Sequence, residues 1–438
     1  MKYKVKITLS LVVLTLLSGW TKAHGQELTS EFSDFHSDTS IIRNQREGVY
    51  LIYSSKYPKS TFIQIDESSP STTSTVLQLN DYIYIKDFHI YGDMVYFCGF
   101  EVTGQGAEAI VGYFNIAYFP TCQVYYYIYP YAMSFNKLDI YEIPYSPYER
   151  HVVMTGSVSS TVGCIVDAYP TSPTQWNFVR SDMLHNTYIF DDVEARDTNI
   201  AFSARTVDST GNPVGEIWFF TKPMVAGTTI LMTNLHKKII NFPAPTSPIW
   251  MEKCPNDNLA ITYGTMNENH VIVTSMNDVV NRPVLLEFRE KWIAKDIKYN
   301  VFSKELEVLV TEFPYDQTLE RIFQFPYTFF VGTFLGGYSY CHEYRVDIDR
   351  LCSFDNTFSR GDNFIVSGFE TVRNNMCFYK YAYNFWGECT NNPREFVMPI
   401  AFSGMITSFD LPMSFPVVQT RVEMNTKEFD IEYVKKCQ

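Results

Sequence analysis

Short, nearly continuous runs of β-branched, aromatic and aliphatic residues recur along the chain, and several of them close on a small residue. Runs of this kind are typical of strands that are buried on both faces. Seven such runs contain the reference positions Leu51, Tyr96, Val153, Ala201, Ala260, Val308 and Ile365. Their spacings are 45, 57, 48, 59, 48 and 57 residues, with a mean of about 52. A period of this size indicates a repeat architecture.

Each run is predicted to be one of four strands in its repeat. A turn and a second strand follow it, as in Gln105-Gly106 before residues 110–119. A third strand follows in several repeats, and a shorter segment with an acidic residue comes before the run. Four antiparallel strands repeated about seven times predict an all-β fold, a single β-propeller. We expect seven four-stranded blades, with six or eight left open, while two β-sandwich domains would explain the single period less well.

The N-terminus has the pattern of a secretory signal peptide. Three lysines within the first six residues precede the apolar run 7–17, and small residues precede Gln26. The run is shorter than the roughly 20 residues that a membrane helix needs, and no later run is longer. We therefore expect residues 1–25 to be cleaved and the mature chain to be secreted or periplasmic, with no transmembrane segment. An uncleaved anchor is the alternative.

Residues 26–438 are expected to form one propeller domain. The first and last repeats are the least regular, so N-terminal and C-terminal strands are predicted to close the ring together. Residues 417–422 and 429–434 have the strand-like composition that this role requires.

Degenerate motifs accompany the strands, such as Asp87-Phe88 followed by Val95-Tyr96-Phe97-Cys98-Gly99, and Gly112-Tyr113-Phe114. In these motifs the chain resembles uncharacterised secreted β-propeller proteins of Gram-negative bacteria, over most of its mature length. The resemblance implies a propeller fold and an exported location, and it implies no activity. Trp-Asp repeats, sialidase boxes and a series of kelch Gly-Gly pairs are missing from the sequence, which disfavours those families.

Composition and charge narrow the range of partners. The chain is 46% hydrophobic and 19% charged, which favours a folded core over disorder. Its 35 Lys and Arg residues against 48 Asp and Glu give a formal charge of −13, without a basic cluster that could follow a phosphate backbone. We expect no nucleic-acid partner, a monomeric chain, and a protein or glycan as ligand.

One acidic residue stands on or just before the first predicted strand of each repeat. These residues are Asp34, Asp87, Asp139, Asp192, Glu252, Asp296 and Asp347. They are expected to line the central channel, where converging carboxylates would offer oxygen ligands to calcium or to a basic ligand. The favoured alternative is that each carboxylate accepts backbone N–H bonds from a turn or a neighbouring blade, because a feature of every repeat usually serves the repeat. No other cofactor is expected.

Nine cysteines in an exported chain make disulfides plausible. Cys341 and Cys352 flank a polar turn and are the first candidate pair, across an expected hairpin. Cys377 and Cys389 are the second candidate pair.

Signatures of catalysis are missing from the sequence, which has no HExxH, no Gly-x-Ser-x-Gly and no phosphate-binding glycine loop. The tyrosines between residues 125 and 131 are expected to fill the outer gap between blades, or to stack on sugars. We therefore expect an exported binding protein with a ligand site on one face, built from inter-blade loops. The alternative is a glycoside hydrolase or lyase that uses carboxylates at the channel mouth.

Overall fold

The structure is a computed structural model, and it describes the chain between Leu28 and Lys435 with interruptions. The interruptions are residues 33–38, 47, 57–58, 67–72, 105, 119–121, 128–132, 144–145, 159–161, 173–174, 183–187, 197–198, 208–209, 229–237, 244, 246, 266–268, 276–283, 289–291, 313–318, 328–338, 347–349, 356–362, 371–374, 383–393, 397–399, 402–405, 408–414, 417–424 and 431–432. The predicted signal peptide, residues 1–25, lies outside the described residues.

The described strands form seven antiparallel sheets, which confirms the all-β prediction; we number them by their first strand. Sheet 1 contains β2 (Thr39–Arg46), β3 (Val49–Lys56), β4 (Lys59–Asp66) and β5 (Thr73–Asp81). Sheet 2 contains β6 (Ile83–Tyr91), β7 (Met94–Thr103), β8 (Gly106–Asn115) and β9 (Cys122–Tyr127). Sheet 3 contains β10 (Met133–Ile143), β11 (Ser146–Val158), β12 (Val162–Ser172) and β13 (Gln175–Asp182).

The remaining sheets follow the same plan. Sheet 4 contains β14 (Ile189–Ala195), β15 (Asn199–Val207), β16 (Pro213–Thr221) and β17 (Lys238–Pro243). Sheet 5 contains β18 (Trp250–Cys254), β19 (Asn258–Gly264), β20 (Asn269–Ser275) and β21 (Val284–Phe288). Sheet 6 contains β22 (Trp292–Asn300), β23 (Glu305–Glu312), β24 (Leu319–Pro326) and β25 (Ser339–Val346). Sheet 7 contains β26 (Arg350–Asp355), β27 (Asn363–Glu370), β28 (Asn375–Ala382) and the N-terminal β1 (Leu28–Phe32).

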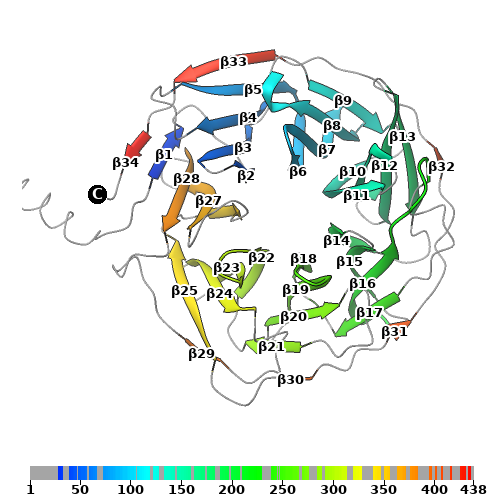
Figure 1. The fold of residues 1–438 in the computed structure, drawn as a ribbon, viewed down its shortest axis with the longest axis vertical. Helices are drawn as coiled ribbons and strands as arrows, with labels where there is room; N and C mark the ends of the chain where they lie inside the picture. The colour runs from blue at the N-terminus through cyan, green and yellow to red at the C-terminus, as the bar shows by residue number, and fades with distance from the viewer. Residues whose placement is uncertain are drawn as a thin grey trace, which may run out of the picture.

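The sheets lie around a central space, with their first strands nearest the centre (Figure 1). The seven apolar runs of the sequence are the second strands: β3, β7, β11, β15, β19, β23 and β27. Buried apolar side chains collect between successive sheets, as where Phe62 of sheet 1 meets Phe88, Phe97 and Phe114 of sheet 2 with ring centroids 5.1–5.8 Å apart. A similar cluster joins each pair of neighbouring sheets from sheet 2 to sheet 6. This distribution disfavours two sandwich domains, each with its own core.

The C-terminal tail adds a fifth strand at the rim of six sheets, which the sequence pattern did not predict. These strands are β29 (Arg394–Phe396) on β25, β30 (Ile400–Ala401) on β21, β31 (Ile406–Thr407) on β17, β32 (Phe415–Pro416) on β13, β33 (Asn425–Asp430) on β5 and β34 (Tyr433–Lys435) on β1. Among the described residues, the tail adds strands to sheets 6, 5, 4, 3 and 1 in the reverse of their chain order and ends on sheet 7 (Figure 1). Within the predicted segment 429–434, β33 pairs with β5 and β34 pairs with β1, whereas none of 417–422 can be compared because residues 417–424 are not described.

Small residues close the second strands because the first strand passes against them. A Cβ atom on Gly99 would clash with the carbonyl oxygen of Tyr84, and one on Gly156 would lie 2.6 Å from the carbonyl oxygen of Ser134. Both neighbours stand one or two positions before a β-bulge in the first strand. Glycine therefore permits the close approach of two backbones that this bulge requires.

Candidate functional site

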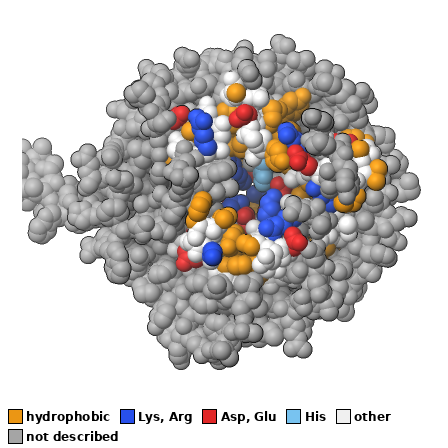
Figure 2. All heavy atoms as spheres, viewed as in Figure 1, with side chains coloured by type: hydrophobic (Ala, Val, Ile, Leu, Met, Phe, Trp, Pro, Cys, Tyr) orange, Lys and Arg blue, Asp and Glu red, His pale blue; other side chains and the backbone are white. Residues whose placement is uncertain are grey.

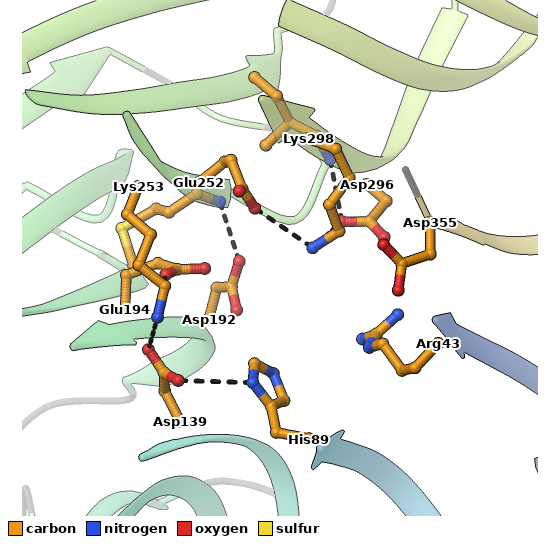
Figure 3. Close-up of polar contacts among 12 residues, drawn as sticks. Arg43, His89, Asp139, Asp192, Glu194, Glu252, Lys253, Asp296, Lys298 and Asp355 are labelled. Carbon is orange, nitrogen blue, oxygen red and sulfur yellow. Dashed lines mark hydrogen bonds and ion pairs between the residues drawn. The ribbon is translucent and has the colours of Figure 1, made fainter. Parts of the chain in front are cut away.

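Five of the seven acids predicted to line the channel are described, and all five lie on first strands. Asp87 lies on β6, Asp139 on β10, Asp192 on β14, Glu252 on β18 and Asp296 on β22. Four of the five appear around one central space in Figure 3. Asp34 and Asp347 lie outside the described residues.

A bulge in the first strand sets the direction of these side chains. The register of the first strand against the second shifts between Ile85 and Asp87, between Phe190 and Asp192, and between Ala294 and Asp296. A bulge bends its strand and redirects the next side chain. The acid that follows the bulge in these three sheets is therefore turned away from the ladder.

The channel carboxylates bind backbone N–H groups of their own strand and of the next sheet. The Oδ1 atom of Asp139 accepts from the amide of Ile140 at 2.8 Å, and its Oδ2 atom accepts from Ala195 of β14 at 2.6 Å. Asp192 repeats this arrangement with Val193 at 2.9 Å and with Met251 of β18 at 2.8 Å. These bonds agree with the favoured alternative of the sequence analysis, in which the repeated acids serve the repeat.

Asp355 plays the same part in sheet 7. Its Oδ2 atom accepts a 2.8 Å bond from the backbone N–H of Asn44 on β2, so it joins the last sheet to the first across 311 residues. The sequence analysis chose Asp347 in this repeat and missed Asp355. Asp355 pairs with Ile365 in the ladder, as Asp139 pairs with Val153. Ile365 and Val153 are both reference positions of the sequence analysis, so counting back from Ile365 would have identified Asp355.

Basic side chains alternate with the acids, so the ring is not purely acidic. Asp87 lies 3.1 Å from Nη2 of Arg43 and 3.8 Å from Nζ of Lys137, and these two residues come from the sheets on either side. The Nζ atom of Lys298 lies 3.2 Å from Oε2 of Glu252 and 3.7 Å from Oδ1 of Asp296. Cations shared between neighbouring sheets therefore neutralise much of the carboxylate charge.

Lys253 contacts residues of two sheets other than its own. Its Nζ atom from sheet 5 donates to Oδ2 of Asp139 in sheet 3 at 2.7 Å and to the carbonyl of Ala195 in sheet 4 at 3.2 Å. It also lies 3.6 Å from Oε2 of Glu194. One ammonium group thus connects three sheets (Figure 3).

The carboxylates on the two sides of Lys253 differ in proton affinity. Burial favours the neutral acid at Asp139, but Lys253 and His89 outweigh it and lower the pKa of Asp139. Burial raises the pKa of Asp192 to about 7, and Asp296 adds to the effect. Burial also raises the pKa of Glu194 well above its usual value, with Asp139 and Glu252 adding to it against Lys253. The carboxyl groups of Asp192 and Glu194 therefore hold their protons more tightly than that of Asp139 does.

His89 lies between two of the acids, with its Nδ1 atom 3.4 Å from Oδ1 of Asp139 and its Nε2 atom 3.9 Å from Oδ2 of Asp87. Burial lowers the pKa of His89 to about 4, although both carboxylates oppose this shift. The imidazole is consequently neutral at pH 7.

The centre of the molecule is hollowed, and charged side chains of both signs and a histidine are visible in it (Figure 2). The side chain of Lys253 is 35% exposed and that of His89 is 27% exposed, against 3% for Asp139 and 7% for Glu194. A ligand that enters the hollow would therefore meet the basic groups and the imidazole before it reached most of the acids.

A metal centre is not evident in the part of the chain that the structure describes. No group of three or more His, Cys, Asp or Glu side chains there is arranged to hold a metal ion. Among the same residues, no helix is long and apolar enough to span a bilayer.

The proposed disulfides involve residues whose side chains are not described. The hairpin expected between Cys341 and Cys352 does not form, because β25 is the fourth strand of sheet 6 and β26 is the first strand of sheet 7. This removes the geometric basis for that pair. Cys377 lies on β28, and Cys389 lies outside the described residues. Tyr125, Tyr126 and Tyr127 lie on β9, the outer strand of sheet 2 among the described residues.

Comparison of the sequence with protein-family models gives no match, and comparison with curated proteins gives no relative. The function must therefore be inferred from the geometry of the chain itself.

Proposed function

We propose that this chain is an exported, seven-bladed β-propeller that binds a protein or glycan ligand on one face and catalyses no reaction. Seven sheets around a common centre and the bond from Asp355 to Asn44 support the propeller. The apolar clusters between successive sheets support it as well, because radial packing of sheet on sheet is how a propeller buries its core.

The engagement of the channel carboxylates carries the argument for binding rather than catalysis. Both oxygens of Asp139 and both oxygens of Asp192 accept backbone N–H bonds. A nucleophile or general base needs an oxygen free to meet the substrate, within about 2.6–3.2 Å of the reacting atom. These two carboxylates are instead used to hold neighbouring sheets together.

The exposed apolar side chains favour one face for the ligand. In an antiparallel sheet, the turn from strand one to strand two and the turn from strand three to strand four emerge on the same side. That side carries Val225 at 65%, Val301 at 63% and Phe302 at 50% exposure. Among the described residues, the most exposed apolar side chain on the opposite side is Val207 at 46%. Exposed apolar side chains on a rigid surface are typical of contact sites.

A buried polar cluster fixes the turn that carries Val225. The Oε1 atom of Glu149 accepts from the amide of Gly227 at 2.6 Å, and the hydroxyl of Tyr169 donates to the carbonyl of Gly227 at 3.1 Å. Glu149 is itself held by the Nε2 atom of His151 at 2.9 Å. The turn of sheet 4 is therefore anchored to sheet 3, which lowers the entropy that a contact there would lose on binding.

In this cluster the imidazole of His151 is held between two tyrosine rings and beside two carboxylates. The imidazole of His151 stacks between Tyr141 and Tyr169, with ring centroids 4.7 and 4.6 Å away, and its Nδ1 atom lies 2.9 Å from Asp167. Burial opposes the charge of the imidazole, but Asp167 and Glu149 outweigh burial and raise the pKa of His151. We assign the cluster to positioning of the turn.

A carbohydrate-active enzyme is the second candidate, because Asp139 with a lowered pKa lies near Glu194 and Asp192 with raised pKa values. Carboxylates whose pKa values are pushed apart are how glycosidases divide the roles of acid and base. The two functions differ in one observable, the release of product.

The test is retention of the mature chain on arrays of glycans and of purified secreted proteins, with a parallel assay for reducing ends. We expect retention without product, at least tenfold weaker in Val225→Asp and unchanged in Val207→Asp, the matched change on the opposite face. Product release that Asp192→Asn abolishes would overturn the proposal in favour of the enzyme. Failure of both arrays to retain the protein would overturn it as well.

A further inference from the structure

Among the described residues, the channel has fewer cations than carboxylates. Its described carboxylates are Asp87, Asp139, Asp192, Glu194, Glu252, Asp296 and Asp355. Its described cations are Arg43, Lys137, Lys253 and Lys298. With His89 neutral, seven carboxylates and four cations leave a formal deficit of three positive charges. Buried charge of one sign must be compensated by protons or by bound cations.

The channel already shows how it holds an ammonium group. The Nζ atom of Lys253 has three oxygen neighbours from two other sheets, which are Oδ2 of Asp139, the carbonyl of Ala195 and, at 3.6 Å, Oε2 of Glu194. The Nζ atom of Lys298 likewise lies between the carboxylates of Glu252 and Asp296. Oxygen acceptors from different sheets therefore converge on the three donors of a primary ammonium.

One carboxylate oxygen among the described residues of the channel accepts no hydrogen bond. Glu194 is 5% exposed, and its Oε2 atom is buried with no hydrogen-bond partner among the described residues. The ammonium of Lys253, at 3.6 Å, is beyond hydrogen-bond reach and donates to Asp139 and Ala195 instead. Asp192 and Glu252 are close enough for their charges to raise the pKa of Glu194. In Figure 3 the carboxylates of Glu194 and Asp192 lie next to each other beneath Glu252.

We propose that the channel binds a primary ammonium group of a ligand, such as the side chain of a lysine or the end of a polyamine, at the Oε2 atom of Glu194, beside the negative charges of Asp192 and Glu252. The inference deepens the proposed binding function and rests on it. The hollow seen in Figure 2 is the route of entry.

Binding is an exchange of cations and involves no covalent step. Burial and the neighbouring carboxylates raise the pKa of Glu194 and so favour a proton there, which an arriving ammonium would displace into the solvent. Because the pKa of Asp192 is about 7, the carboxyl groups around Glu194 together become more negative as the pH rises from 6 to 8. Affinity for an ammonium should rise over the same interval, and proton release should accompany binding below the pKa of Glu194.

Isothermal titration calorimetry with 1,5-diaminopentane tests the inference, with 1,5-pentanediol as the uncharged probe. Titrations at pH 7 in two buffers of different ionisation enthalpy count the protons released, and titrations at pH 6 and pH 8 give the pH dependence. We expect the diamine to bind with release of protons, to bind more tightly at pH 8, and the diol not to bind.

Glu194→Gln is the decisive variant, since glutamine has the shape of the neutral acid and should leave the melting temperature unchanged. We expect at least tenfold weaker diamine binding in Glu194→Gln, and unchanged binding in Asp93→Asn, which removes an exposed carboxylate from the β6–β7 turn. Equal binding by wild type and Glu194→Gln would overturn the inference, and so would equal binding of the diol or displacement of the diamine by micromolar calcium.

The two proposals can fail separately. Array retention without diamine binding would overturn the ammonium site and leave the binding function intact. Failure of both the arrays and the diamine titration would overturn both.

Discussion

The inner and outer strands of this molecule are held by different kinds of interaction. At the centre, side chains join sheets that are far apart in sequence, as where Asp355 binds the amide of Asn44 and Lys253 reaches Asp139. At the rim, β30, β31 and β32 of the tail pair through ladders of only two residue pairs each, while β33 pairs with β5 over six. The inner contacts are buried and charged, whereas the rim contacts described here are main-chain ladders. The inner ring, meaning the side-chain contacts among the first strands, should therefore contribute more to the free energy of unfolding than the pairing of the tail does.

Among the side-chain truncations, the largest effect on stability is expected from Asp139→Ala. This change leaves Lys253 without its 2.7 Å partner and the amide of Ala195 without its acceptor. Removal of one partner from a buried ion pair costs about 3–5 kcal/mol. Urea unfolding followed by circular dichroism measures the loss, with Asp93→Asn as the control. A loss below about 1 kcal/mol would show that the inner ring does not dominate.

A smaller, pH-dependent effect is expected from Asp192. Its pKa is about 7 in the folded protein against an ordinary value of 3.8, so the folded state binds this proton more tightly. The resulting stability is complete below pH 3.8 and is lost as the pH rises through 7. The free energy of unfolding of wild type relative to Asp192→Asn should therefore fall between pH 4 and pH 8, by at most about 1.4 kcal/mol per pH unit. A difference that stays flat over this interval would contradict the assignment.

His89 should act in the opposite direction. Its folded pKa of about 4 lies below the ordinary 6.5, so its contribution is complete above pH 6.5 and is lost as the pH falls through 4. Relative to His89→Asn, the wild type should lose stability on acidification from pH 6.5 to pH 4. Paired thermal melts at half-unit pH steps would show this, and a gain of stability on acidification would reverse the sign that we assign.

The smallest effect is expected at the rim. Thr407→Pro removes the backbone donor of one residue in β31, which pairs with Ile239 of β17. The net value of one such hydrogen bond is about 0.5–1.5 kcal/mol. The same substitution at Val308, in the middle of β23, should prevent folding, because proline cannot occupy an inner strand. A rim variant as damaging as the inner one would remove the distinction between the two regions.

The sequence allowed the inner part of the fold to be predicted better than the rim. The apolar second strands have a period because each is buried on both sides, and Asp87, Asp139 and Asp192 recur because each binds the next strand. Arg43 and Lys253 were missed because their positions gain meaning only when neighbouring sheets stand side by side. A two-residue strand such as β30 has no pattern to detect, since its pairing depends on where the rest of the chain has placed β21.

The most direct test of the account is hydrogen exchange at the amides of Ala195 and Met251, the donors to Asp139 and Asp192. If these carboxylates hold neighbouring sheets together, both amides should exchange only through global unfolding, with protection equal to that of the slowest amides in the protein. In Asp139→Ala the amide of Ala195 should lose that protection selectively, while Met251 stays within the slow group. Rapid exchange of both amides in the wild-type protein would contradict the central claim that carboxylate-to-amide bonds around the channel join neighbouring sheets.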